Sequence, residues 1–221
     1  MYAEMIRLIL SGVWLTVLIF AAVIVLALPL GFLVTLLLRS RVTPLRGLAR
    51  AYVYVIRGTP LLLQLIFFFY GLYYIPVVGP WISMYLGREE AAILAFVINY
   101  SAYFAEIFRG GMNAVDRGQY EASQVLGLTR FQTTVHIAIP QMLRVVLPAL
   151  TNESVTLVKD SALIYAVGLL DILGRTKDAV NLYASAVPYI FAGILYLALT
   201  SLVTLIYRRI ETRFRSNVIN K

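Results

Sequence analysis

The sequence has no cysteine and one histidine, His136. Disulfides, thiol chemistry and cysteine metal sites are therefore excluded, and so is a metal centre built from several histidines. Charged residues are also scarce, at 14% of the 221 residues, against about 25% in a soluble domain. Because hydrophobic residues make up 61%, the composition rules out both a soluble globule and a disordered chain.

The hydrophobic residues form five long runs. A helix needs about 20 mostly apolar residues to cross the hydrocarbon core of a bilayer. The first run is too long for the apolar core of a signal peptide, which has about 7–15 residues, and Pro29 is expected to kink or end its straight part. We expect an all-α integral membrane protein with one domain, residues 1–221, and five transmembrane helices at about 8–38, 51–74, 91–108, 142–170 and 186–207.

Basic residues collect in alternate connections. The third connection and the C-terminal tail are rich in arginine, and the first connection has no acid beside Arg39, Arg41, Arg46 and Arg50. In the second and fourth connections acids balance the bases. Connections rich in Lys and Arg face the cytoplasm, which predicts an N-terminus outside and a C-terminus in the cytoplasm. The net charge of +8 then reflects topology and anionic lipid, and no nucleic-acid partner is expected.

The connection at about 112–140 carries the most specific pattern. A short helix is predicted over 119–126, with Gly127 as its left-handed stop. A second amphipathic piece, about 129–139, leads to Pro140, which suits the start of a helix. The first helix has an apolar face that can lie along the membrane or against a partner, formed by Ala122, Val125 and Leu126. The pattern alone leaves an ordinary interfacial loop and a contact for a soluble motor both open.

Several motifs resemble those of ABC importer permeases. Glu121-Ala122-Ser123, followed by Gly127 and Pro140, resembles their EAA loop, with serine in place of the second alanine. Residues 57–64 (RGTPLLLQ) and residues 103–111 (YFAEIFRGG) resemble stretches of the polar amino acid permeases. Asn152-Glu153 and residues 159–163 (KDSAL) resemble a stretch of the fourth helix in those permeases, although Ser161-Ala162 replaces the more usual Thr-Ser.

The resemblance implies a type I ABC importer permease for polar amino acids, in the bacterial plasma (inner) membrane. In that family two permease subunits pair, and two cytoplasmic ATP-binding subunits dock on the EAA loops, here at Glu121, Ala122, Ser123 and Gly127. An extracytoplasmic binding protein delivers the amino acid. Because the chain has no GxxxxGK[ST] loop, which cradles phosphates, we expect no cofactor here, and ATP and Mg²⁺ on the partner ATPase. A homodimer is preferred and a heterodimer stays open.

The fourth span holds polar residues that apolar neighbours surround. At about 100° per residue they share an arc of about 120° on one helix face; they are Asn152, Glu153, Thr156, Lys159 and Asp160. An ionisable residue in a span costs about 2.5–3.5 kcal/mol at the helix centre, so it needs a partner or a function. The stripe is either a substrate path or a network that locks helices together. Gln64 and Asn99, in other spans, are further candidates for substrate contact or for hydrogen bonds between helices.

The charges of the stripe favour a basic substrate. Glu153 and Asp160 against Lys159 leave one net negative charge, which suits arginine, lysine or histidine, translocated by alternating access. A permease for glutamine or glutamate is the alternative. A membrane enzyme with these residues as acid–base groups has less support, because no second carboxylate motif, metal-ligand set or nucleophile completes a site. A stand-alone carrier or channel also has less support, because five spans make an incomplete pathway and the EAA loop would have no purpose.

Overall fold

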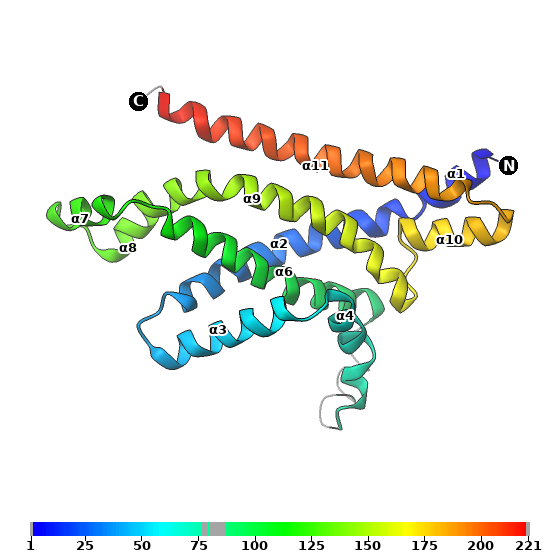
Figure 1. Ribbon diagram of the computed structural model, residues 1–221, viewed down its shortest axis with the longest axis horizontal. Coiled ribbons are helices and arrows are strands. Elements are labelled where there is room, and N and C mark those ends of the chain that lie inside the picture. Colours follow the sequence, from blue (N-terminus) through cyan, green and yellow to red (C-terminus); the bar gives the residue numbers. More distant parts are fainter. Residues whose placement is uncertain (1, 77–78, 80–86, 220–221) are drawn as a thin grey trace.

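The computed structural model describes residues 2–76, 79 and 87–219. Long helices that run roughly side by side form most of the described chain (Figure 1). In chain order they are α1 (Tyr2–Leu10), α2 (Val13–Leu38), α3 (Thr43–Gly58), α4 (Leu61–Phe69), the 3₁₀ turn η1 (Gly71–Tyr74), α6 (Arg88–Asn113), α7 (Arg117–Val125), α8 (Arg130–Thr133), the π-helical turn η2 (Thr134–Ala138), α9 (Ile139–Asp160), the 3₁₀ helix η3 (Ser161–Val167), α10 (Ile172–Tyr183) and α11 (Val187–Ile219).

Four helical segments of the described residues are long and apolar enough to cross a membrane. They are 2–38, 88–113, 130–167 and 187–213. A fifth span is formed if the bent pair α3 and α4 crosses as one unit. The all-helical fold with several spanning helices is therefore confirmed, and the predicted total of five depends on that pair.

The second span is not the continuous helix expected over 51–74. It bends by 103° between α3 and α4, at Thr59 and Pro60. Proline disfavours the helical region for the residue before it, and Thr59 is extended, with φ −119° and ψ 147°. Pro60 also lacks an N–H to continue the ladder. The sequence prediction missed this helix break because the segment is apolar throughout, although the Gly-Thr-Pro sequence encodes the break.

Other boundaries also differ from the sequence prediction. Helix α2 continues through Pro29 to Leu38, so the proline does not end it. The fourth span ends at Gly168, which is left-handed with φ +76°, and α10 follows it as a helix that the sequence had not predicted. Asp171 begins α10 because its carboxylate accepts a hydrogen bond from the Gly174 N–H at 2.9 Å.

Helix α6 is the centre of the bundle and contacts α2, α3, α4 and α9. Helix α2 approaches it closely at Gly31, where a Cβ atom would lie 2.8 Å from Phe104 Cβ. One turn further on, the Thr35 hydroxyl donates to the Ala105 carbonyl at 2.9 Å. Small residues allow such close contact between helices in a membrane, so α6 is held rigidly with its remaining faces toward α3, α4 and α9.

Candidate functional site

The polar face of α9 is only partly buried. Glu153, Thr156 and Asp160 are half-buried, whereas Asn152 and Lys159 are exposed. Thr156 turns its hydroxyl back to the Asn152 carbonyl at 3.0 Å. The described residues offer Glu153 and Lys159 neither a hydrogen bond nor an ion pair, so both charges on this face are open to a ligand or to another subunit.

Asp160 has one partner from α6. The Tyr100 hydroxyl donates to Asp160 Oδ2 at 2.7 Å, and the Tyr100 ring stacks on Phe96 with their centroids 6.2 Å apart. Because the ring is buried and packed, the hydroxyl is held in a defined place beside the carboxylate. No sequence motif pointed to Tyr100. The available signal was its position in the middle of an apolar span, where a tyrosine hydroxyl needs a partner.

Gln64 and Asn99 are buried at the break between α3 and α4. The Gln64 amide nitrogen donates to the Ile56 carbonyl at 2.8 Å and to the Thr59 hydroxyl at 2.7 Å. The Asn99 amide nitrogen donates to Gln64 Oε1 at 3.0 Å. The Pro60 break leaves backbone carbonyls of α3 without helical partners, and these side chains satisfy one of them. The structure therefore gives both residues hydrogen bonds within the chain, separate from the α9 stripe.

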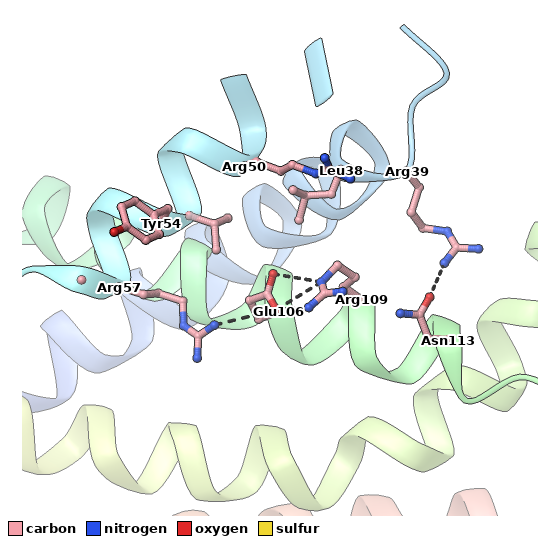
Figure 2. A pocket seen from close by; sticks show the side chains of 10 residues that line it. Leu38, Arg39, Arg50, Tyr54, Arg57, Glu106, Arg109 and Asn113 are labelled. Atoms are coloured by element: carbon pink, nitrogen blue, oxygen red, sulfur yellow. Dashed lines mark hydrogen bonds and ion pairs between the residues drawn. The ribbon is translucent and has the colours of Figure 1, made fainter. Parts of the chain in front are cut away.

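A group of charges lies between α3 and α6 (Figure 2). Arg57 and Arg109 approach Glu106 from two sides; the Arg57 ion pair is long, at 3.8 Å, whereas Arg109 Nε donates to both Glu106 oxygens at 3.0 and 3.1 Å. The Arg57 guanidinium also lies over the Tyr103 ring, 5.1 Å from its centroid. Glu153 lies within the electrostatic reach of Arg57, so this cation adjoins the α9 stripe.

The predicted loop helix is present as α7. Asp116 caps its N-terminus by accepting from the Gly118 N–H at 2.6 Å. Gly127 follows the helix with φ +73°, a left-handed conformation that glycine adopts without strain. The Gly127 stop agrees with the predicted end of the helix, whereas the Asp116 cap starts α7 two residues before the predicted start at 119. On α7, Glu121 and Ala122 are exposed and Ser123 is buried.

The loop surface is apolar where a partner can reach it. Val125, Leu126 and Phe131 are 89%, 75% and 75% exposed. The chain then continues as one helical segment from Arg130 to Val167, which begins with a capping box between Thr129 and Gln132. Pro140 lies in the first turn of α9, as predicted. This segment runs from the loop to Asp160, so a displacement of the loop can be transmitted to the polar stripe.

Comparison with known proteins decides the family. Residues 27–216 match the family described as binding-protein-dependent transport system inner membrane component. The chain belongs to this permease family. It is 34% identical over 210 residues to the arginine transport system permease protein ArtQ of Bacillus subtilis (strain 168), covering 95% of this chain and 93% of that protein. It is 33% identical to the putative glutamine transport system permease protein GlnP of Rickettsia conorii, covering 88% and 87%.

Solved structures share the fold of this permease. A crystal structure of an amino acid ABC transporter with histidines has a TM-score of 0.85 and 31% identity, and covers 96% of each chain. A structure of the MetNI methionine ABC transporter in an inward-facing conformation has a TM-score of 0.77 at 23% identity, covering 97% of this chain and 99% of that one, which supports the fold alone. The permease thus has the type I ABC importer fold expected from its motifs.

Membership in the family establishes the general role. The chain is a transport subunit of an amino acid ABC importer in the inner membrane and crosses it several times. It is not an enzyme, because ATP hydrolysis belongs to a separate partner subunit, and importers of this family also work with a binding protein.

Proposed function

We propose that this permease translocates a basic amino acid, arginine, lysine or histidine, along the polar face of α9. The observation that carries the proposal is the pair of half-buried carboxylates, Glu153 and Asp160, on one face of a spanning helix. An intramembrane charge is stabilised by a partner of opposite sign. Within the described chain Glu153 has no hydrogen-bonded cation, so a cationic substrate would supply the missing partner.

The geometry suggests how each group of the substrate is held. Lys159 would bind the α-carboxylate, and Glu153 and Asp160 would receive the cationic groups, with Tyr100 holding Asp160 in position. Asn152 and Thr156 would add neutral hydrogen bonds, and Gln64 and Asn99 would shape the path through the α3–α4 break. Charge-assisted hydrogen bonds of this kind contribute about 1.5–3 kcal/mol each. The arginine permease relative supports this assignment.

A neutral substrate such as glutamine is the second candidate. Arg57 acts electrostatically on Glu153, and an internal cation that neutralises Glu153 would leave the stripe without its net negative charge. The relatives named as glutamine permeases are compatible with that reading. The two candidates differ in whether the charge of Glu153 is available to the substrate.

We further propose that two ATP-binding subunits dock on the coupling loops of two paired permease subunits, a loop that in this chain comprises residues 112–140. The exposed apolar surface of Val125, Leu126 and Phe131 supports a protein contact there, and Glu121 adds a charged edge. ATP and Mg²⁺ would be bound by those subunits. The positive-inside distribution supports a cytoplasmic loop and C-terminus, with the N-terminus outside. The docked motor would move the continuous helix from Arg130 and open the α9 stripe to either side in turn. A second copy of the chain would complete the path.

The substrate assignment is tested by substrate-stimulated ATP hydrolysis in liposomes with the cognate binding protein. Arginine, lysine and histidine are compared with glutamine and glutamate, in the wild type and in Glu153→Gln. We expect selective stimulation by the basic amino acids, lost about tenfold or more in the variant. Glu211→Gln, the same change on α11 away from the stripe, is the control. Equal stimulation by glutamate, or an unselective effect of Glu153→Gln, would contradict the assignment.

The docking site is tested by charge reversal at Glu121. We expect Glu121→Lys to weaken retention of the ATPase during purification and to uncouple hydrolysis from transport, while membrane insertion stays normal. Gly127→Val should be nearly as damaging, because valine strains the left-handed backbone at φ +73°. Normal assembly and transport by both variants would overturn the assignment.

A further inference from the structure

A basic groove of about 700 Å³ lies between α3, α6 and the C-terminal end of α2. Figure 2 shows the side chains around it. The groove has four arginines against one glutamate, a net charge of +3, and its polar lining comprises Arg39, Arg50, Arg57, Arg109, Glu106 and Asn113. Its volume is within the range of about 300–1,000 Å³ that is typical of small-molecule sites.

Two of the four guanidiniums have no carboxylate partner among the described residues, so both keep open N–H donors. Arg109 and Arg57 share the carboxylate of Glu106. Among the described residues, Arg39 donates only to a neutral amide, with its Nη1 2.8 Å from Asn113 Oδ1. The described residues give Arg50 no hydrogen bond and no carboxylate. Each guanidinium has five N–H donors in a planar fork that matches phosphate, so Arg39 and Arg50, which both line the groove, offer open donors to a phosphate group.

The depth of the groove corresponds to the level of lipid phosphates. Helices α2 and α6 have 26 residues each, about 39 Å at 1.5 Å per residue, and the hydrocarbon core is about 30 Å thick. Their ends therefore extend beyond the hydrocarbon. Arg39 directly follows the end of α2, and its partner Asn113 is the last residue of α6. The open donors thus lie in the headgroup region of the bilayer.

Apolar surface adjoins the charged groove. On α3, Tyr54 lines the groove and is 82% exposed, and Leu48 is 70% exposed on the same helix. Val55 is exposed as well. The acyl chains of a bound lipid can contact such surface, whereas a free phosphate ion has no apolar part that could do so. The combination of open guanidiniums and an exposed apolar helix matches an amphipathic anion.

We propose that this groove is a binding site for the phosphate of an anionic phospholipid, with Arg39 and Arg50 as its donors and the exposed side of α3 against the acyl chains. Basic pockets between transmembrane helices recognise acidic headgroups in this way. The proposed donors, Arg39 and Arg50, are not residues of the α9 stripe, and the proposal does not depend on the identity of the transported amino acid.

The test uses the full-length chain in nanodiscs of phosphatidylcholine alone or mixed with phosphatidylglycerol. Native mass spectrometry counts the phosphatidylglycerol molecules that stay bound, and thermal unfolding reports their effect on stability. We expect the Arg39→Gln/Arg50→Gln double variant to retain about tenfold less phosphatidylglycerol, the loss expected for removed charge-assisted hydrogen bonds. Its unfolding midpoint in phosphatidylcholine alone should stay close to the wild type, which shows that the fold survives.

The matched control is Arg46→Gln, which removes one arginine from α3 outside the groove lining. Retention close to wild type in this control supports a defined site, and an equal loss shows only general attraction to the membrane surface and overturns the proposal. Arg39→Lys/Arg50→Lys should retain an intermediate amount, because the charge remains and the fork geometry is lost. Inorganic phosphate is added to phosphatidylcholine nanodiscs as the second arm. If inorganic phosphate raises the unfolding midpoint as much as phosphatidylglycerol does, the lipid assignment is wrong. The assignment is also wrong if the double glutamine variant retains as much phosphatidylglycerol as the wild type.

Discussion

Two carboxylates in apolar surroundings of this permease, Asp171 and Glu153, differ in whether the chain itself gives them hydrogen-bond partners. Asp171, at the start of α10, is 0% exposed and accepts from the Gly174 N–H and from the Tyr196 hydroxyl, each at 2.9 Å. Glu153 on α9 is half-buried and has no hydrogen bond from the described residues. Both cost free energy to bury, but only Asp171 has its partners within its own chain.

The difference separates structural from ligand-facing groups. Burial raises the pKa of the Asp171 carboxyl, while its hydrogen bonds with Gly174 and Tyr196 oppose the shift. The hydrogen bond from Tyr196 joins the start of α10 to α11. Gln64 belongs with Asp171 on this criterion, because its amide nitrogen and oxygen both have partners. Glu153 and Lys159 are ligand-facing groups on the same criterion. Asp160, with one hydrogen-bond partner among the described residues, is intermediate between the structural and the ligand-facing groups.

The largest effect on stability is expected at Asp171. Asp171→Ala leaves the Gly174 N–H and the Tyr196 hydroxyl without their acceptor and removes the cap of α10. We expect the free energy of unfolding to fall by about 3 kcal/mol, measured by denaturation of the purified chain in detergent. Asp171→Asn keeps an acceptor for Gly174, and it should lose less than about 1 kcal/mol. Equal losses in both variants would show that the charge, and not the cap, stabilises this region.

Asp160→Asn should change stability little and transport strongly, the opposite of Asp171→Ala. Asparagine can still accept the Tyr100 hydrogen bond, so the free energy of unfolding should change by no more than about 0.5 kcal/mol. The lost charge should lower uptake of a basic amino acid about tenfold or more, measured as radiolabelled transport in proteoliposomes. A large loss of stability with an equal loss for all substrates would place Asp160 with the structural group.

A smaller loss is expected at the helix break. Gln64→Leu removes the donors to the Ile56 carbonyl and to the Thr59 hydroxyl, which should cost about 1–2 kcal/mol of unfolding free energy. Asn99→Leu and the double variant complete a mutant cycle. A coupling energy of about 0.5–1 kcal/mol would confirm that the Asn99 amide and Gln64 act together, and strictly additive losses would exclude it.

Sequence indicated the helices better than their interruptions. Long apolar runs and paired charges are local patterns, so most of the spans, the end of α7 at Gly127 and the shared face of α9 could be read from residue order. The start of α7 was predicted two residues too late, because its cap, Asp116, was not recognised. The break at Thr59–Pro60 was concealed because hydrophobicity is continuous across it, although Pro60 itself encodes it. Helix α10 mixes charges and apolar residues without a clear period, and its capping residue, Asp171, was the available signal.

Contacts between distant residues could not be predicted in the same way. Tyr100 and Asp160 are 60 positions apart, and Gln64 meets Asn99 from a different helix. Such pairs depend on the orientation of each helix about its own axis. That orientation is set by how α6 packs against α2 at Gly31 and against its other neighbours. The polar groups were therefore identifiable as candidates from sequence, whereas their division into satisfied and open groups required the fold.

The smallest effect is expected at Tyr100, where the intermediate position of Asp160 can be tested directly. Tyr100→Phe keeps the ring stacked on Phe96 and removes only the hydroxyl that donates to Asp160. The carboxylate keeps its charge but loses the group that orients it. A hydrogen bond to a charged acceptor contributes about 1.5–3 kcal/mol, but water can replace much of it in the variant because Asp160 is only half-buried. We therefore expect uptake of a basic amino acid to weaken by about threefold to tenfold, mainly as a higher KM, with the free energy of unfolding within about 1 kcal/mol of the wild type. If Tyr100→Phe abolished transport as completely as Asp160→Asn, orientation and not charge would control the site; if it changed only stability, the hydrogen bond would join α6 to α9 without serving the substrate.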